Sequence, residues 1–223
     1  MNVRTTIVFS SLALIYLATL PLTPYVAQFL PKALPIVVLA VFAYTKLSTM
    51  PRYMVLAALL FSLAGDVSLA LPFADSFITG LACFFVAHLT YAMCFALLHR
   101  RLQETPGDHI ISRKPKWLIS IIMVSFAVMM AVHILPASKA LFYPVVAYIS
   151  VITLMGLTAV WLAQTKLIVT GALLFVISDA ILAQSVFKTP LPLSTFWVMT
   201  TYYGAQYCLT MGLVDGFLRK EKE

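Results

Sequence analysis

The chain has 223 residues, of which 62% are hydrophobic and only 10% are charged. Soluble domains contain roughly 25% charged residues, so this composition excludes a free soluble globule, a disordered chain and a disulfide-stapled secreted module. The net charge of +7 would suggest nucleic acid as the partner of a soluble protein, but in a membrane protein it indicates orientation signals and lipid head-group contacts.

Hydropathy predicts eight transmembrane helices, because a hydrocarbon core about 30 Å thick needs about 20 apolar residues per helix. The apolar run after Arg4 resembles a signal peptide, but its best cleavage position has a bulky residue where a small one is needed, which favours a first span. The second helix is short and has Pro35 in its first turn, where proline is tolerated. We expect the helices at residues 6–26, 33–49, 53–72, 76–98, 117–136, 141–163, 167–187 and 194–217.

The distribution of basic residues predicts the orientation of these helices. Twelve of the 15 Lys and Arg residues fall on the side of the N-terminal tail, and the other three are Lys32, Lys139 and Lys188 in the opposite loops, so none needs to lie inside the bundle. The positive-inside rule then places both termini in the cytoplasm, together with a polar, solvated loop at residues 99–116. We expect one integral-membrane domain over residues 1–223.

A short repeat links the third and seventh predicted helices. An Ala-Leu-Leu-Phe block at residues 58–61 precedes Asp66, and the same block at residues 172–175 precedes Asp179. The match is imperfect, because the second block lies one residue closer to its aspartate than the first. Helices four apart in the chain cross the membrane in the same direction, so the pattern suggests a parallel four-plus-four duplication. The expected halves are residues 1–98 and 117–223.

Asp66 and Asp179 are acidic residues within apolar helices. An ionised Asp at the centre of a bilayer costs roughly 2.5–3.5 kcal/mol even on lenient scales, so such a residue is a functional candidate by default. Asp66 follows Arg52 by fourteen residues and Asp179 follows Lys166 by thirteen, which places both about 20 Å from the cytoplasmic end. Hydrogen bonding between helices for packing alone is the competing interpretation.

Polar residues in the fourth and eighth predicted helices supply partners for these acids. His88 and Tyr91 are three residues apart, as are Tyr203 and Gln206, so each pair shares a helix face. His88 could equally be an ordinary interhelical hydrogen bonder. The sequence contains no serine-hydrolase, zinc-protease or nucleotide-binding motif, and we expect no bound metal.

At these positions the chain resembles the YhhN-like family of integral-membrane lysoplasmalogenases, over essentially its whole length. The family often has adjacent Lys and Pro at the second span, whereas Lys32 and Pro35 are separated here. The motifs that carry the resemblance are Leu-Ala-Gly-Asp at residues 63–66, the segment from Gly80 to Tyr91 that includes His88, Phe-Val-Ile-Ser-Asp at residues 175–179, and Tyr-Gly-Ala-Gln at residues 203–206.

The resemblance implies hydrolysis of the vinyl-ether bond of lysoplasmalogens to a fatty aldehyde and glycerophosphoethanolamine or glycerophosphocholine, without a cofactor. Protonation of the β-carbon forms an oxocarbenium ion, which water then captures. Two buried carboxylates can divide the acid and base roles, as in glycosidases, so Asp66 and Asp179 are the expected catalytic pair, with the individual roles open. The expected substrate-binding residues are His88, Tyr91, Tyr203, Gln206, Lys32 and Ser178.

Two other functions are compatible with the same residues. Intramembrane acids, a histidine and a repeat also suit a proton-coupled transporter of a small or lipid-like solute. Alternatively, the acids only bridge helices in a structural or lipid-binding protein. For the enzyme, the expected partners are a lysophospholipid substrate and the lipids of a bacterial inner membrane, without nucleic acid; the oligomeric state is left open.

Overall fold

The computed structural model describes residues 3–25, 27–103, 113–163 and 165–220. These residues form helices and no strand, which confirms the all-helical prediction for the part of the chain described. The helices are α1 (Val3–Thr19), α2 (Phe29–Lys46), α3 (Thr49–Ala70), α4 (Ser76–Gln103), α5 (Arg113–Ser138), α6 (Phe142–Thr158), α7 (Lys166–Phe187) and α8 (Ser194–Lys220), with shorter helical turns at Leu20–Leu22, Lys139–Leu141 and Ala159–Ala163.

Six segments of the described chain are long and apolar enough to cross a membrane, so the protein is a multi-pass membrane protein. One of them, Pro115–Ala163, has 49 residues and contains most of α5 and all of α6. These two helices pack against each other after the chain reverses at Lys139, where φ is 49°. α8 is not among the six. It is the least hydrophobic of the eight helices, and about half of its described residues are buried in the bundle.

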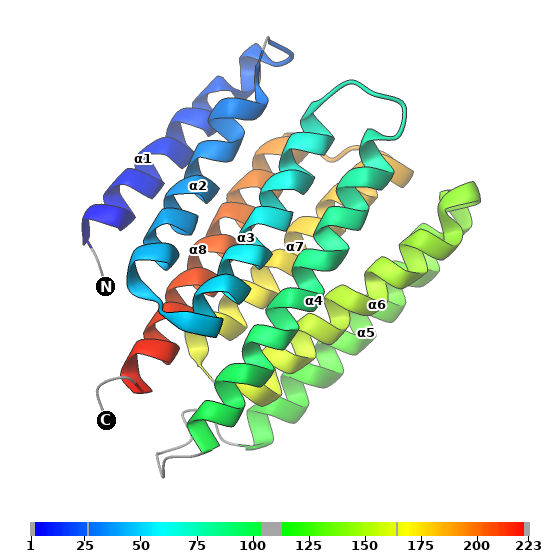
Figure 1. Cartoon of the computed structure of the whole chain (residues 1–223). Helices are drawn as coiled ribbons and strands as arrows, with labels where there is room; N and C mark the ends of the chain where they lie inside the picture. The colour runs from blue at the N-terminus through cyan, green and yellow to red at the C-terminus, as the bar shows by residue number, and fades with distance from the viewer. Residues whose placement is uncertain (1–2, 26, 104–112, 164, 221–223) are drawn as a thin grey trace.

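Figure 1 shows α1 at one side of the bundle and the α5–α6 pair at the opposite side, with α3, α4, α7 and α8 between them. The most extensive contacts join α3 to α4 and α7 to α8. Small residues allow these helices to approach closely: a Cβ at Gly80 of α4 would lie 2.7 Å from the side chain of Leu69 on α3, and one at Gly171 of α7 would lie 2.9 Å from the backbone nitrogen of Leu209 on α8.

Three sequence-based expectations need correction. Lys32 was expected in an external loop, but it lies in α2 and is buried, because the carboxylate of Asp66 compensates its charge inside the bundle. α2 begins at Phe29, so Pro35 lies in the helix interior rather than in its first turn. Residues 99–103 and 113–116 of the predicted loop are helical and extend α4 and α5, whereas residues 104–112 lie outside the described part.

Candidate active site

Asp66 is held by side chains from α2 and α8. The hydroxyl of Tyr202 donates a hydrogen bond of 2.6 Å to Oδ2 of Asp66. Nζ of Lys32 lies 3.1 Å from Oδ1 and donates to the backbone carbonyl of Asp66 at 3.2 Å. Tyr203 contributes indirectly, because its hydroxyl donates to the carbonyl of Lys32 at 2.8 Å. The Asp66 carboxylate is therefore part of a buried ion pair that connects three helices.

Asp179 is held by side chains from α4 and α6. The hydroxyl of Tyr148 donates a hydrogen bond of 2.6 Å to Oδ2 of Asp179. Nε2 of His88 lies 3.4 Å from the same oxygen and 3.1 Å from the Tyr148 hydroxyl. His88 is fully buried, and among the described residues its Nδ1 has no hydrogen-bond partner. Both of these contacts to the Asp179 carboxylate are made at Oδ2.

Phe84 on α4 lies at the junction between these two groups. Its ring packs directly on Gly65, the neighbour of Asp66, and makes edge contacts with Tyr202 and Phe175 at centroid distances of 5.9 and 6.2 Å. Within the described part of the chain, no hydrogen bond or ion pair joins the two carboxylates directly. The structure therefore brings the two acids to opposite sides of an aromatic cluster, each with its own partners.

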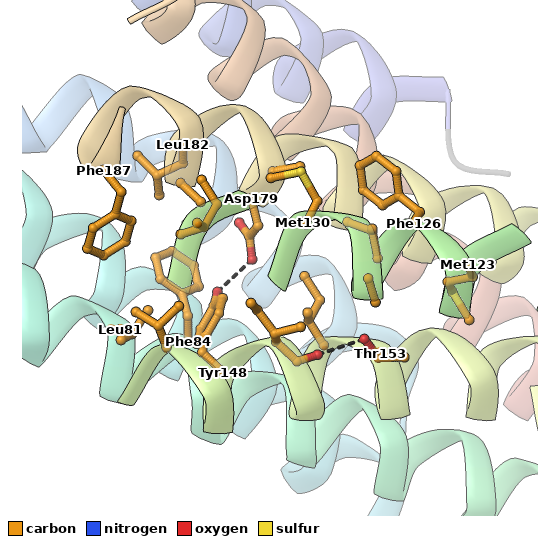
Figure 2. Close-up of a pocket in the computed structure, with 18 of the residues that line it drawn as sticks. Leu81, Phe84, Met123, Phe126, Met130, Tyr148, Thr153, Asp179, Leu182 and Phe187 are labelled. Atoms are coloured by element: carbon orange, nitrogen blue, oxygen red, sulfur yellow. Dashed lines mark hydrogen bonds between the residues drawn. The ribbon is translucent and has the colours of Figure 1, made fainter. Parts of the chain in front are cut away.

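An apolar pocket opens beside Asp179 and is formed by residues of α3, α4, α5, α6 and α7. Its empty volume is about 820 Å³, including the open space at its mouth. Figure 2 shows the carboxyl group of Asp179 and the ring of Tyr148 near the middle of this pocket, joined by their hydrogen bond. Asp179 is the only charged residue among the described residues that line it, and its side chain is 14% exposed. The Asp179 side chain thus borders an apolar space.

The remaining predicted residues lie close to the two acids but do not contact either carboxylate. Tyr91 and Gln206 pair with each other, since the Tyr91 hydroxyl donates to Oε1 of Gln206 at 2.5 Å between α4 and α8. Ser178 donates to the backbone carbonyl of Val198 at 3.0 Å and ties α7 to α8. None of the three lines the apolar pocket.

Tyr148 and Tyr202 contact the carboxylates directly, although the sequence analysis did not single them out. Tyr202 lies four residues before Gln206, which places both on one face of α8 and could have indicated a polar stripe. Tyr148 lies in the apolar helix α6 without a polar neighbour at helical spacing, so the sequence contains no comparable signal for it. In the described chain, no group of three or more His, Cys, Asp or Glu side chains is placed to hold a metal ion.

Comparison with known proteins identifies relatives over most of the chain. The model of the YhhN family matches residues 27–213. The chain is 34% identical over 184 residues to lysoplasmalogenase TMEM86B of Homo sapiens, covering 82% of this chain and 73% of the relative. It is 32% identical over 160 residues to TMEM86B of Sus scrofa, covering 70% and 61% of the two chains. It is 29% identical over 171 residues to lysoplasmalogenase TMEM86A of Bos taurus, covering 72% and 65%. No solved structure matches the chain significantly.

Proposed function

Because the chain belongs to the YhhN family, we propose that it is a lysoplasmalogenase, which hydrolyses the vinyl-ether bond of 1-alkenyl lysophospholipids to a fatty aldehyde and a glycerophospho-alcohol. The relatives named above are lysoplasmalogenases. The observation that carries the proposal is the position of Asp179, whose side chain lines an apolar pocket while Tyr148 and His88 contact its Oδ2.

Asp179 is the acid of the proposed reaction. Its carboxyl group transfers a proton to the β-carbon of the vinyl ether, and the double-bond electrons form the new C–H bond. The ether oxygen then shares the positive charge of an oxocarbenium ion. Water adds to the α-carbon, a proton returns to the carboxylate, and the hemiacetal breaks down to the aldehyde and the free hydroxyl of the glycerol. Proton transfer by a positioned carboxyl group contributes typically 10²–10⁴-fold to such a rate.

Asp66 is the second carboxylate of the proposed pair and acts at a distance. Phe84 and Tyr202 contact each other beside it, so its contribution is the dipole of the buried ion pair that it forms with Lys32, which carries no net charge. In a low-dielectric interior such a dipole acts more strongly than in water. Lys32 and Tyr203 hold Asp66 in place, and His88 and Tyr148 orient Asp179. Tyr91, Gln206 and Ser178 position α4, α7 and α8, which carry these groups.

We further propose that all eight helices cross the membrane, as two parallel repeats of four helices with both chain termini in the cytoplasm. The partners of the two acids support the repeat. Asp66 on α3 is held by α2 of its own half and by α8 of the other half. Asp179 on α7 is held by α6 of its own half and by α4 of the other. Each acid thus takes one partner from the second helix of its own half and one from the fourth helix of the other, as a two-fold repeat requires.

The proposed function is tested by supplying the full chain, purified and reconstituted in bilayers, with a 1-alkenyl lysophosphatidylethanolamine and measuring the aldehyde. We expect aldehyde from the 1-alkenyl lipid, with a slower rate in heavy water because protonation of carbon is part of the reaction. The 1-alkyl lipid has no double bond to protonate, and ester cleavage of the 1-acyl lipid needs an oxyanion site, so both should compete without being cleaved rapidly. Absence of aldehyde would favour a transporter or a structural protein, and rapid release of fatty acid would contradict vinyl-ether selectivity.

A further inference from the structure

A groove runs along the outer surface of the α5–α6 pair, and none of the residues that line it also lines the pocket beside Asp179. Its empty volume is about 1170 Å³, including the open space at its mouth. Val128 and Val132 in its lining are 57% and 72% exposed, so the groove faces the lipid that surrounds a multi-pass protein. The lining residues on α5 recur at helical spacing and form one stripe: Val128, Ala131, Val132, Leu135 and Pro136.

The groove ends at a cation and two aromatic rings. Lys139 lies in the turn after α5, and Phe142 and Tyr143 begin α6. The two rings meet edge to face with their centroids 5.4 Å apart, and Tyr143 is 81% exposed. Among the described residues, no carboxylate forms an ion pair with Lys139. Figure 1 shows this turn at the end of the bundle away from both chain termini, and an exposed tyrosine at a helix end is typical of a membrane surface.

The length of the groove corresponds to one leaflet of a bilayer. From Val128 to Lys139 the chain advances eleven residues, about 16 Å along the helix axis at 1.5 Å per residue. The hydrocarbon core of a bilayer is about 30 Å thick, so one leaflet supplies about half of that depth. A lipid whose head group lies at Lys139 therefore extends its chain along the whole α5 stripe.

We propose that this groove binds an anionic phospholipid of the surrounding bilayer, with its phosphate at Lys139 and one acyl chain along the α5 stripe. Lys139 supplies the charge complementary to the phosphate, and the hydroxyl of Tyr143 can donate a hydrogen bond at the same level. The side chains of the stripe have no polar atoms, so an acyl chain covers them without leaving a polar group unpaired. A second copy of the chain, related by a two-fold axis along the membrane normal, would place its own Lys139 at the same level, where the two like charges repel.

Photoaffinity labelling in bilayers tests the occupant of the groove. The full chain is reconstituted in phosphatidylcholine with a small fraction of phosphatidylglycerol that has a diazirine in the middle of one acyl chain, and the adducts are mapped by mass spectrometry. We expect adducts on residues 128–135 that unlabelled phosphatidylglycerol reduces and unlabelled phosphatidylcholine does not. Phosphatidylcholine with the same diazirine is the control probe and should label this stripe no more than other exposed residues such as Trp197. Equal labelling of the stripe by the two probes would overturn the proposal.

Replacement of the lysine tests the position of the phosphate. Lys139→Gln should lower labelling by the phosphatidylglycerol probe about fivefold, because one basic residue near an anionic membrane surface contributes about 1 kcal/mol. Lys188→Gln is the matched control, since Lys188 is also exposed and follows α7 at the same end of the bundle but does not line the groove. It should leave the labelling unchanged. An equal effect of the two substitutions would contradict the assignment of the phosphate to Lys139.

A blocking variant tests the path of the acyl chain. Ala131→Phe fills the groove with a ring, so we expect labelling of the stripe by phosphatidylglycerol to fall to the level of the phosphatidylcholine probe. Ile122→Phe adds the same ring to the exposed surface of α5 outside the groove and should change nothing. Unchanged labelling in Ala131→Phe would refute this path.

Two further outcomes would replace the phospholipid by another occupant. Dimerisation of the chain that displaces the probe would make the groove an interface between two copies. Displacement of the probe by a lysophospholipid at a far lower concentration than by phosphatidylglycerol would make it a site for single-chain lipids. Either result would overturn the proposal, and none of these measurements depends on the proposed enzymatic function.

Discussion

Asp66 and Asp179 each accept a hydrogen bond of 2.6 Å from a tyrosine, but the rest of their surroundings differ. Asp66 faces the cation of Lys32 and is 2% exposed. A buried ion pair contributes little net stability, yet removal of one partner leaves an uncompensated charge that costs about 3–5 kcal/mol. Asp179 is next to the imidazole of His88 and borders the pocket. We therefore attribute proton transfer to Asp179 and a structural as well as an electrostatic role to Asp66.

Replacement of each acid by its amide separates these roles. We expect Asp179→Asn to lower hydrolysis by about 10²–10⁴-fold with little change in thermal stability, because the amide retains the size of the side chain. Asp66→Asn should lower both activity and stability, because Lys32 loses its counterion. The double variant Lys32→Met with Asp66→Asn removes both charges and should regain the stability. Activity and thermal unfolding of the purified variants provide the measurements. Near wild-type turnover of Asp179→Asn would exclude it as the acid.

The sequence identifies the charged residues of the site better than their hydrogen-bond partners. Asp66, Asp179 and His88 are recognisable because an ionisable group in an apolar helix is costly. Tyr148 is not, because tyrosine is common in membrane helices and only the packing of α6 on α4 and α7 shows which one faces an acid. Lys32 was misplaced because it lies in the first turn of α2, where a basic residue is as compatible with an external loop as with a buried ion pair.

Among the elements, the α7–α8 pair shows why glycine is needed at a helix contact. A Cβ at Gly171 would lie 2.9 Å from the nitrogen of Leu209 and 3.0 Å from the carbonyl oxygen of Ala205, and both atoms belong to the backbone of α8. At Gly204 the nearest atom is a terminal methyl group of Leu174, at 3.2 Å. A side chain can rotate away from a new methyl group, whereas a helix backbone can only move as a whole.

Alanine substitutions at these two glycines should therefore differ in effect. Gly171→Ala is expected to destabilise the protein by about 1–3 kcal/mol, as overpacking typically does, because it forces α7 and α8 apart. Gly204→Ala should be tolerated, since Leu174 can adjust and alanine favours a helix over glycine by roughly 1 kcal/mol. Thermal unfolding of the two variants in the same detergent compares them. A midpoint for Gly171→Ala equal to that of the unchanged protein would refute the backbone contact.

Hydropathy predicts the positions of the helices but not the space between them. Each described helix overlaps the segment expected from the sequence, and the differences lie at helix ends, such as the start of α2 at Phe29 and the end of α4 at Gln103. Hydrogen bonds and packing determine where a helix ends, and a hydropathy profile contains no information about either. The pocket could not be predicted either, because the side chains that line it from five helices are of the same apolar types as the core.

At the scale of the whole molecule, the two halves of the proposed repeat differ in how they surround their acids. The α3–α4 and α7–α8 pairs form the centre of the bundle, and each provides one acid and one partner for the acid of the other pair. In the first half, the second helix contributes the cation Lys32, which neutralises Asp66. In the second half, it contributes the neutral hydroxyl of Tyr148, and the pocket opens beside Asp179. The proposed repeat would thus hold one acid in an ion pair and the other at the edge of a pocket.

The arrangement of the ends predicts the topology of the chain in the membrane. Figure 1 shows that α1 begins and α8 ends at the same end of the bundle, as an even number of crossings requires. With Lys32 and Lys116 both buried, the other basic residues of the sequence divide eleven to two between the two sides expected from the sequence, and the richer side carries both termini. Such a bias retains that end in the cytoplasm.

Reporter fusions test this topology at three positions. A reporter at the C-terminus and another within residues 104–112 should both indicate the cytoplasm, because the basic residues flank these positions. A third reporter, inserted between α7 and α8 at residues 188–193, serves as the internal control and should indicate the opposite side, since one helix separates it from the C-terminus. If the C-terminal and 104–112 reporters disagreed, α5 to α8 would cross the membrane an odd number of times. The four-helix repeat would then be excluded, whatever the enzymatic activity.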